Sequence, residues 1–448
     1  MVACPHDKAP FGSPICRHLR DCREPALGYV KWYIGSGLEA ELLCLPCAEE
    51  RERGLPVESN FLCEDCFDYA SAEVGYLVGV RGRPEIRIRS EPFNSTLKET
   101  PLPKQIGKIV DMAPLNSAGR SEWLMLADSG QLIRIDANSL DWAGVGSVTV
   151  PLESDHKPRM GHMLRRRLHS SGDGLFAAVV NDYGRYGEVV DLRSGKVTLL
   201  LDGGQYHPET VPFSFAFASV LGRSVAIHRT QWNRLDVSDP SSGELLSQRV
   251  PESYRSGEDR PDHYLDYFHG ALYVSPGGTY ILDDGWFWAP VGIPTVWSLE
   301  RWISENVWES EDGPTRLLIC GRPYYWDRAM CWLGGTRIAI GGIGDDDEAM
   351  IDGVTIFDVM TPGPPAGCLR ADIRGAREVT AFAGPAGVFF SDGASLFSSG
   401  DTGVSRWDPE DGSRTGHLEN FSPSHYHSAA REFVQLIDNT LVRWSNTS

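Results

Sequence analysis

Cysteine and histidine residues gather in close pairs within the first 70 residues, and this pattern limits what that part of the chain can fold into. Seven of the ten cysteines lie there. Two Cys-x-His pairs and two Cys-x-x-Cys pairs follow one another: Cys4 with His6, Cys16 with His18, Cys44 with Cys47, and Cys63 with Cys66. Zn²⁺ takes four such nitrogen and sulfur ligands at tetrahedral corners, and a short spacing lets both members of a pair reach one ion. The eight residues therefore predict two zinc sites.

The expected role of the metal is structural. A segment of about 70 residues buries too little apolar surface to be stable without help, and the binding energy of a metal can supply the difference. Four protein ligands at each ion leave no open position for water, as in structural rather than catalytic sites. We therefore expect a small zinc-stapled α+β module over residues 1–72.

The spacing leaves the assignment of pairs to ions open. Each pair can share an ion with its neighbour, the first with the second and the third with the fourth, or the first pair can join the third and the second the fourth. The latter is a cross-brace, and in this respect residues 4–66 resemble small treble-clef or RING-like zinc domains. The opening Cys-x-His departs from a RING. Cys22 is a further alternative, because it can replace Cys16 or His18 as a ligand or remain a free, oxidisable thiol.

Downstream, one short phrase recurs along the chain at intervals of 37 to 62 residues. An apolar, strand-forming run ends in an aliphatic or aromatic residue followed by Asp or Ser. The instances are Ile135-Asp136, Val190-Asp191, Leu235-Asp236, Trp297-Ser298, Phe357-Asp358, Trp407-Asp408 and Trp444-Ser445. Gly-containing turns and further strands lie between them, and four antiparallel strands per 40 to 60 residues are typical of a β-propeller blade.

Residues 104–448 resemble WD40-like propellers, and the closest local match is the segment Arg406-Trp-Asp-Pro-Glu-Asp-Gly412. The resemblance implies an all-β ring, and seven phrases predict seven blades. The last phrase ends close to residue 448, so the final blade lacks an outer strand. We expect residues 73–103 to be a linker with a ring-closing strand, and the alternating stretch Glu85–Ser90 to be that strand.

Charge and hydropathy restrict the partners. A net charge of −19 disfavours nucleic acid and anionic membranes. The basic stretch from Lys157 to Arg167 is an exception, and we interpret it as a solvated loop. No apolar run has the roughly 20 residues that span a bilayer, and no signal peptide is visible, so we expect a cytoplasmic protein. Reduced thiols in that compartment favour metal binding over disulfides.

Catalytic motifs are lacking: the sequence has no Gly-x-Ser-x-Gly, His-Glu-x-x-His or P-loop pattern. The leading hypothesis is a non-enzymatic scaffold that binds a protein partner. The aromatic residues between Trp286 and Trp308 either pack in the blade core or form a partner-binding surface around an enlarged fourth blade, extended by Arg301 to Pro314; on the second alternative Trp302 or Trp308 is exposed. The alternative is a propeller hydrolase or lyase with a site at the central channel, for which His425 and His427 are candidates. A third hypothesis is a sensor in which zinc or the Cys22 thiol alters docking.

Overall fold

A computed structural model of the protein describes most of the chain. The described residues are 11–21, 28–33, 40–63, 66, 77–81, 84–116, 120–153, 162–250, 254, 257, 259–344, 350–363, 366–367 and 375–446. Over these residues strands dominate, as an all-β fold requires. None of the described helices is both long enough and apolar enough to cross a membrane.

The N-terminal part forms one five-stranded mixed sheet, in the order β4-β1-β3-β2-β5. Its elements are β1 (Phe11–Cys16), α1 (Arg17–Asp21), β2 (Tyr29–Tyr33), β3 (Ala40–Leu43), α2 (Leu45–Glu52), β4 (Ser59–Leu62) and β5 (Leu77–Arg81). A single small core, which includes Ile15, Val30 and Leu43, holds the sheet and α2 together. β5 pairs with β2 and lies beyond residue 72, so the sheet extends further than the boundary expected from the sequence.

The following residues form a succession of antiparallel sheets, most of them four-stranded and consistent with propeller blades. The first two are β7 (Ile109–Leu115), β8 (Glu122–Ala127), β9 (Gln131–Asp136) and β10 (Trp142–Ser147), then β11 (Arg165–Ser170), β12 (Phe176–Asp182), β13 (Tyr186–Asp191) and β14 (Lys196–Asp202). The next has three described strands, β15 (Phe215–Val220), β16 (Arg223–Gln231) and β17 (Arg234–Ser238). Short 3₁₀ helices, η1 (Lys104–Ile106) and η2 (Pro208–Thr210), lie between strands.

A larger sheet follows, in which two blade-like units are joined through β22 and β28. Its first unit contains β18 (Phe268–Val274), β19 (Tyr280–Phe287), β20 (Val291–Gly292), β21 (Thr295–Ser298), α4 (Leu299–Ser304), α5 (Glu309–Asp312), β22 (Leu317–Leu318), β23 (Cys320–Pro323) and β27 (Ala366–Gly367). Its second unit is β24 (Met330–Leu333), β25 (Arg337–Ile343), β26 (Ile351–Gly363) and β28 (Gly375–Ala383). The helices α4 and α5 form an insertion between β21 and β22 of this unit.

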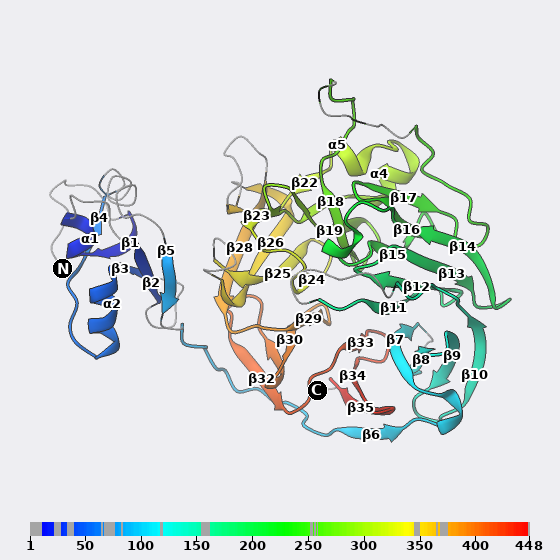
Figure 1. Cartoon of the computed structure of the whole chain (residues 1–448). Helices are drawn as coiled ribbons and strands as arrows, with labels where there is room; N and C mark the ends of the chain where they lie inside the picture. Colours follow the sequence, from blue (N-terminus) through cyan, green and yellow to red (C-terminus); the bar gives the residue numbers. More distant parts are fainter. Residues whose placement is uncertain are drawn as a thin grey trace.

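The last two sheets have regular four-stranded pairing. They are β29 (Val388–Ser391), β30 (Leu396–Gly400), β31 (Gly403–Trp407) and β32 (Arg414–Glu419), then β33 (His425–His427), β34 (Glu432–Ile437), β35 (Thr440–Ser445) and β6 (Lys98–Pro101). Figure 1 shows the sheets following one another around a ring, with the cyan strand β6 beside the red strand β35.

The recurring phrase marks one position in these sheets. In each case it ends, or lies within, the third strand, as at β9, β13, β26 and β35. In four of the five instances with Asp, the carboxylate accepts a hydrogen bond from the backbone amide two residues later and so stabilises the following turn, as Asp136 does from Asn138; Asp236 instead pairs with Arg234 and Arg249. A local turn rule therefore explains why the phrase repeats with the sheets.

Apolar cores between neighbouring sheets hold the ring together. The innermost strands from β7 through β11, β15, β18 and β24 to β29 contact one another in turn, and β33 of the last sheet contacts β7 of the first. Phe397 of β30 and Phe433 of β34 share a core between the last two sheets. The core at this junction combines Trp123 of β8 with Val434 and Leu441 of β34 and β35. The ring is therefore closed by packing as well as by strand pairing.

The ring-closing strand is not the one expected. β6 pairs antiparallel with β35, with Lys98 opposite Arg443, whereas Ile88 of the predicted strand makes an isolated parallel bridge to Arg414 of β32. The reason is where the apolar anchors lie: Phe93 packs on Trp444 with ring centroids 5.0 Å apart, and Leu102 enters the first core. These contacts place residues 98–101 at the open edge and leave 85–90 beside the preceding sheet.

Candidate metal centre

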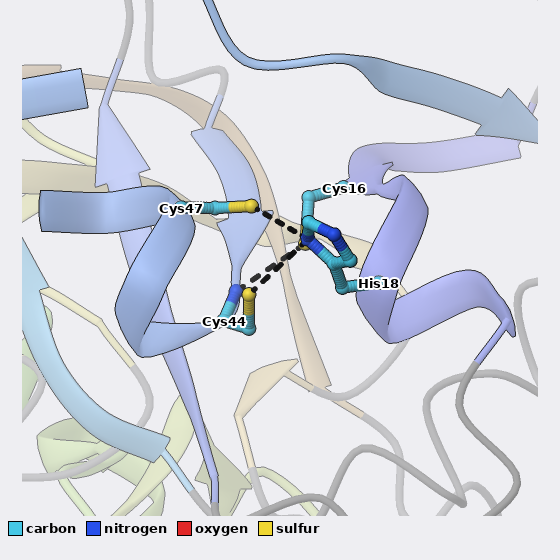
Figure 2. Close-up of side chains that lie close together, drawn as sticks. All are labelled: Cys16, His18, Cys44 and Cys47. Atoms are coloured by element: carbon cyan, nitrogen blue, oxygen red, sulfur yellow. Dashed lines mark hydrogen bonds between the residues drawn. The ribbon is translucent and has the colours of Figure 1, made fainter. Parts of the chain in front are cut away.

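Four predicted ligands converge at one edge of the N-terminal sheet: Cys16, His18, Cys44 and Cys47. Cys16 ends β1, and Cys44 follows directly after β3. Because β1 and β3 run parallel, with Ile15 paired to Leu42, their carboxyl ends meet at the same edge. His18 lies in α1 and Cys47 in the first turn of α2, so each helix starts at the site (Figure 2).

The distances in this cluster suit one metal ion. The four ligand atoms all lie within 4.8 Å of one another. His18 Nδ1 is 3.0 Å from Cys47 Sγ and 3.8 Å from Cys44 Sγ. Metal–sulfur bonds of about 2.3 Å in a tetrahedron put neighbouring ligand atoms roughly 3.8 Å apart. The donor set of three sulfurs and one nitrogen is one that Zn²⁺ takes in closed structural sites.

The surroundings of the cluster favour neutral thiols as long as no cation is bound. Cys16 and Cys47 are buried, Cys44 is half-buried and only His18 is exposed. Burial raises the pKa of the Cys47 thiol far above its ordinary value, and contact with Cys44 and Cys16 adds to this effect. Burial also raises the pKa of Cys16. A divalent cation would reverse these shifts, because coordination deprotonates a thiol.

A second interaction ties the cluster to the backbone. The Cys44 amide donates to Cys16 Sγ over 3.3 Å. Amide donors to sulfur are a common support for thiolate ligands, because they stabilise negative charge on the sulfur. This bond therefore helps to hold the Cys16 sulfur at the site, beside the backbone of Cys44.

The pairing of ligands differs from both expected arrangements. The second pair, Cys16 and His18, meets the third pair, Cys44 and Cys47, rather than its neighbour on the other side or the fourth pair. The fourth pair is Cys63, which is buried directly after β4, and the half-buried Cys66. Cys4, His6 and Cys22 lie outside the described residues.

The two candidate histidines of the ring have different environments. His425 lines a central cavity of about 720 Å³, and its Nε2 is 3.0 Å from Asp111 Oδ1. His427 is buried, with Nε2 3.1 Å from the Glu122 carbonyl oxygen and its ring edge-on to Trp123. Only His425 therefore faces the channel, and its carboxylate partner was not predicted from the sequence.

Asp111 joins three sheets and supplies a pH-dependent contact. Its carboxylate accepts hydrogen bonds from His425 of β33 and from the Leu168 amide of β11. Burial alone would raise the pKa of this carboxyl, but the bonds from His425 and Leu168 outweigh it, so the pKa lies below its usual 3.8. The resulting stabilisation is present above the unfolded-state pKa and is lost as pH falls through the folded-state pKa.

We expect Asp111→Asn to lower the free energy of unfolding by about 1–3 kcal/mol at neutral pH. The difference from wild type should shrink below about pH 4, because the wild-type carboxyl then becomes protonated too. Urea unfolding at neutral pH and below pH 4 measures this difference in stability, and Asp401→Asn, at an exposed position, is the control. A difference that is the same at both pH values would contradict the assignment.

The end of the basic stretch, Arg165 to Arg167, is part of a strand rather than a solvated loop, whereas residues 157–161 lie outside the described residues. Arg165, Arg166 and Arg167 begin β11, which lines the central cavity. Arg165 and Arg167 both contact Asp182, whose side chain is fully buried on the adjacent β12. Asp182 lies 17 residues after Arg165 in the sequence but directly opposite it in the paired strands. The three consecutive arginines are therefore compatible with a strand, because a buried carboxylate on the neighbouring strand balances part of their charge.

The aromatic residues also separate into core and surface. Trp302 is fully buried against Trp297, and Trp308 is half-buried under His263 and Arg249, so for Trp302 the core alternative holds. Trp286 and Trp288 of the same stretch join other aromatic residues in a surface cluster, which we call the aromatic patch. It consists of Tyr206, Trp232, Phe268, Trp286, Trp288 and Trp326.

The aromatic patch has a buried floor and an exposed rim. Phe268 and Trp286 stack with centroids 4.5 Å apart and are almost inaccessible. Tyr206 and Trp288 remain 47% and 45% exposed. Because Tyr206 and Trp326 come from connections between sheets and Trp232 from the β16–β17 turn, the patch lies at the loop-bearing ends of several sheets.

Comparisons with known proteins add little to this description. No protein family and no curated protein matches the sequence. Among solved structures, the chain is similar to one from the "Crystal Structure of Mitotic Checkpoint Complex", with 12% identity and a TM-score of 0.46, over 81% of this chain and 99% of that one. The strand pairing described above, not this likeness, is the basis of the fold assignment.

Proposed function

We propose that this chain is a non-enzymatic protein-interaction scaffold, in which a module held by two structural zinc ions precedes a seven-bladed, WD40-like propeller. The observation that supports a binding role best is the aromatic patch, because soluble proteins rarely leave large aromatic side chains clustered at their surface without a partner. Partly exposed Trp and Tyr over a fixed apolar floor are also the side chains that most often dominate binding energy.

Residues Cys16, His18, Cys44 and Cys47 would hold one zinc ion of the proposed module. Cys63 and Cys66, with Cys4 and His6, are the remaining pairs and are our candidates for the second. When bound, such ions supply folding energy rather than chemistry. We place the module at residues 1–81, a linker at 82–97 and the ring from residue 98 onward, which moves the boundaries that the sequence predicted at residues 72 and 103.

A protein partner would insert a side chain beside Trp288 and cover Tyr206. The pair offers two amphipathic rings, of which Trp288 is held edge-on by Phe268 and Trp286. Rings that are already fixed lose little conformational entropy on binding, which favours their use as anchors. The net charge of −19 further favours a partner whose contact surface carries Lys or Arg.

Trp288→Ala should weaken capture of the partner about 30-fold, the equivalent of about 2 kcal/mol, while leaving the melting temperature nearly unchanged. The assay is affinity purification from the native host followed by titration of the recovered partner. Trp142→Ala is a matched control, because Trp142 is 43% exposed on β10, away from the aromatic patch. Equal capture by both variants would overturn the proposed binding face.

Trp302→Ala, in contrast to Trp288→Ala, is expected to lower the stability of the fold. Trp302 is fully buried and its Nε1 donates to the Val307 carbonyl oxygen over 3.2 Å. Its removal should cost about 3–5 kcal/mol of unfolding free energy through the cavity that it leaves. Denaturant unfolding tests this, and a loss below about 1 kcal/mol would contradict the core assignment.

A further inference from the structure

The central cavity of the ring has the size of a small-molecule site. Its volume is about 720 Å³, and residues of the innermost strands β7, β11, β15, β18 and β29 line it. Pockets that bind cofactors and metabolites commonly measure about 300–1,000 Å³ and combine apolar walls with a few convergent polar groups. The channel has both kinds of wall.

The charges on the cavity wall oppose those of the whole molecule. The chain carries 61 acidic and 42 basic residues. The wall, however, includes three arginines, Arg165, Arg166 and Arg167, and one carboxylate, Asp111. Arg166 is engaged, because its guanidinium donates to the carbonyl oxygens of Asp128 and Val150.

Arg165 and Arg167 share a single counter-ion. Their Nε atoms lie 3.2 and 2.8 Å from the same oxygen, Asp182 Oδ2. Two guanidinium groups together have ten N–H donors, and one carboxylate has about four acceptor positions. The triad therefore has a net positive charge and more donors than its own acceptor can satisfy.

The other nearby carboxylates are already partnered. Asp111 accepts from His425 and from the Leu168 amide. Asp327 accepts from the Tyr183 hydroxyl, and His162 Nε2 lies 3.6 Å from it. They help to balance Arg167 at long range, but their own hydrogen bonds leave the spare donors of the triad for another acceptor.

Two residues along β11 from Arg167, on the same face, His169 provides a polar atom inside an apolar wall. Its Nε2 is buried and has no hydrogen-bond partner among the described residues. The ring lies 5.1 Å from Phe215, which packs edge-on to Phe217. Burial lowers the pKa of His169 to about 4, so the imidazole is neutral at physiological pH and adds no charge.

The geometry points to a binding site for a small organic anion in the central cavity. Arg167 and Arg165 would bind its carboxylate or phosphate group, and its apolar part would lie against His169 and Phe217. Guanidinium groups suit both anions because their planar donors match two oxygens at once. This site is separate from the aromatic patch and does not depend on the proposed partner.

Phenylacetate, phenyl phosphate and the neutral phenylacetamide test this site by isothermal titration of the full chain. We expect at least one of the two anions to bind about tenfold or more tightly than phenylacetamide, because the charge-assisted hydrogen bonds are lost with the amide. The tighter anion identifies the preferred group. Equal binding of all three probes, or no binding at millimolar concentration, would overturn the site.

The matched variants are double replacements that keep the charge balance. Arg167→Gln with Asp182→Asn should weaken anion binding about tenfold or more, whereas Arg193→Gln with Asp191→Asn, an ion pair at the start of the β13–β14 turn, should not. Unchanged binding in the first variant would contradict the role of Arg167. If that variant fails to fold, the rate at which phenylglyoxal modifies Arg167 in the wild-type protein tests the site instead. A bound anion should slow this modification, and phenylacetamide should not.

Discussion

A chain that begins at Lys104 is expected to be insoluble or to melt far below a chain that begins at Pro84. The shorter chain lacks β6, the outer strand of the last sheet, together with Phe93 and Leu102. It loses strand hydrogen bonds at about 1 kcal/mol each and the burial of two large apolar side chains at about 1.5–3 kcal/mol each. The sum is comparable with the whole stability of a typical domain.

The exposed edge adds to this loss. Without residues 93–102, Trp444 loses its ring contact with Phe93 and the acceptor for its Nε1, the Asn94 carbonyl oxygen at 2.7 Å. The freed edge of β35 is then available for pairing with other chains, which leads to aggregation. Scanning calorimetry and light scattering measure both effects. A Lys104 chain that melts within about 2 °C of the Pro84 chain would contradict ring closure by β6.

Replacing Cys44 and Cys47 by Ser should unfold the N-terminal module and leave the ring intact. Structural zinc contributes on the order of 10 kcal/mol to the folding of small domains, far more than the core around Ile15 and Leu43 can replace. The described apolar cores of the module and the ring share no residue, so the ring should keep its melting transition.

Limited proteolysis followed by mass spectrometry measures this result. In the Cys44 and Cys47 variant we expect cleavage between residues 11 and 81, while the chain after residue 98 stays protected. Cys320→Ser with Cys331→Ser is the matched control, since both cysteines are buried in the ring. The control should leave the module resistant to protease. Equal protection of the module in the Cys44 and Cys47 variant would show that the cluster does not hold it together.

Local patterns in the sequence predicted most of the parts of this fold. The Cys and His pairs predicted the type of metal ligand, because a short spacing brings two side chains to one point whatever the rest of the chain does. The phrase ending in Asp or Ser predicted the third strands, because the turn that follows depends on that side chain. Both signals act over a few residues and are therefore visible in a single sequence.

Long-range pairing accounts for what the sequence did not reveal. Cys16 meets Cys44 because β1 and β3 are parallel neighbours, which no spacing rule specifies. Glu85–Ser90 alternates like a buried strand, yet Ile88 is 66% exposed, and the closing strand is set by Phe93 and Leu102 instead. The arginines of β11 resemble a loop until their partner, Asp182, is placed opposite.

The number of zinc ions bound to the purified full-length chain tests the central claim, a metal-held module in front of a closed ring, most directly. Elemental analysis should find two zinc ions per chain for wild type and for the Cys320 and Cys331 control. We expect fewer than two after Cys44→Ser with Cys47→Ser, because the cluster then keeps only Cys16 and His18. Wild-type protein with one zinc ion or none, or a Cys44 and Cys47 variant that retains two ions, would contradict the account.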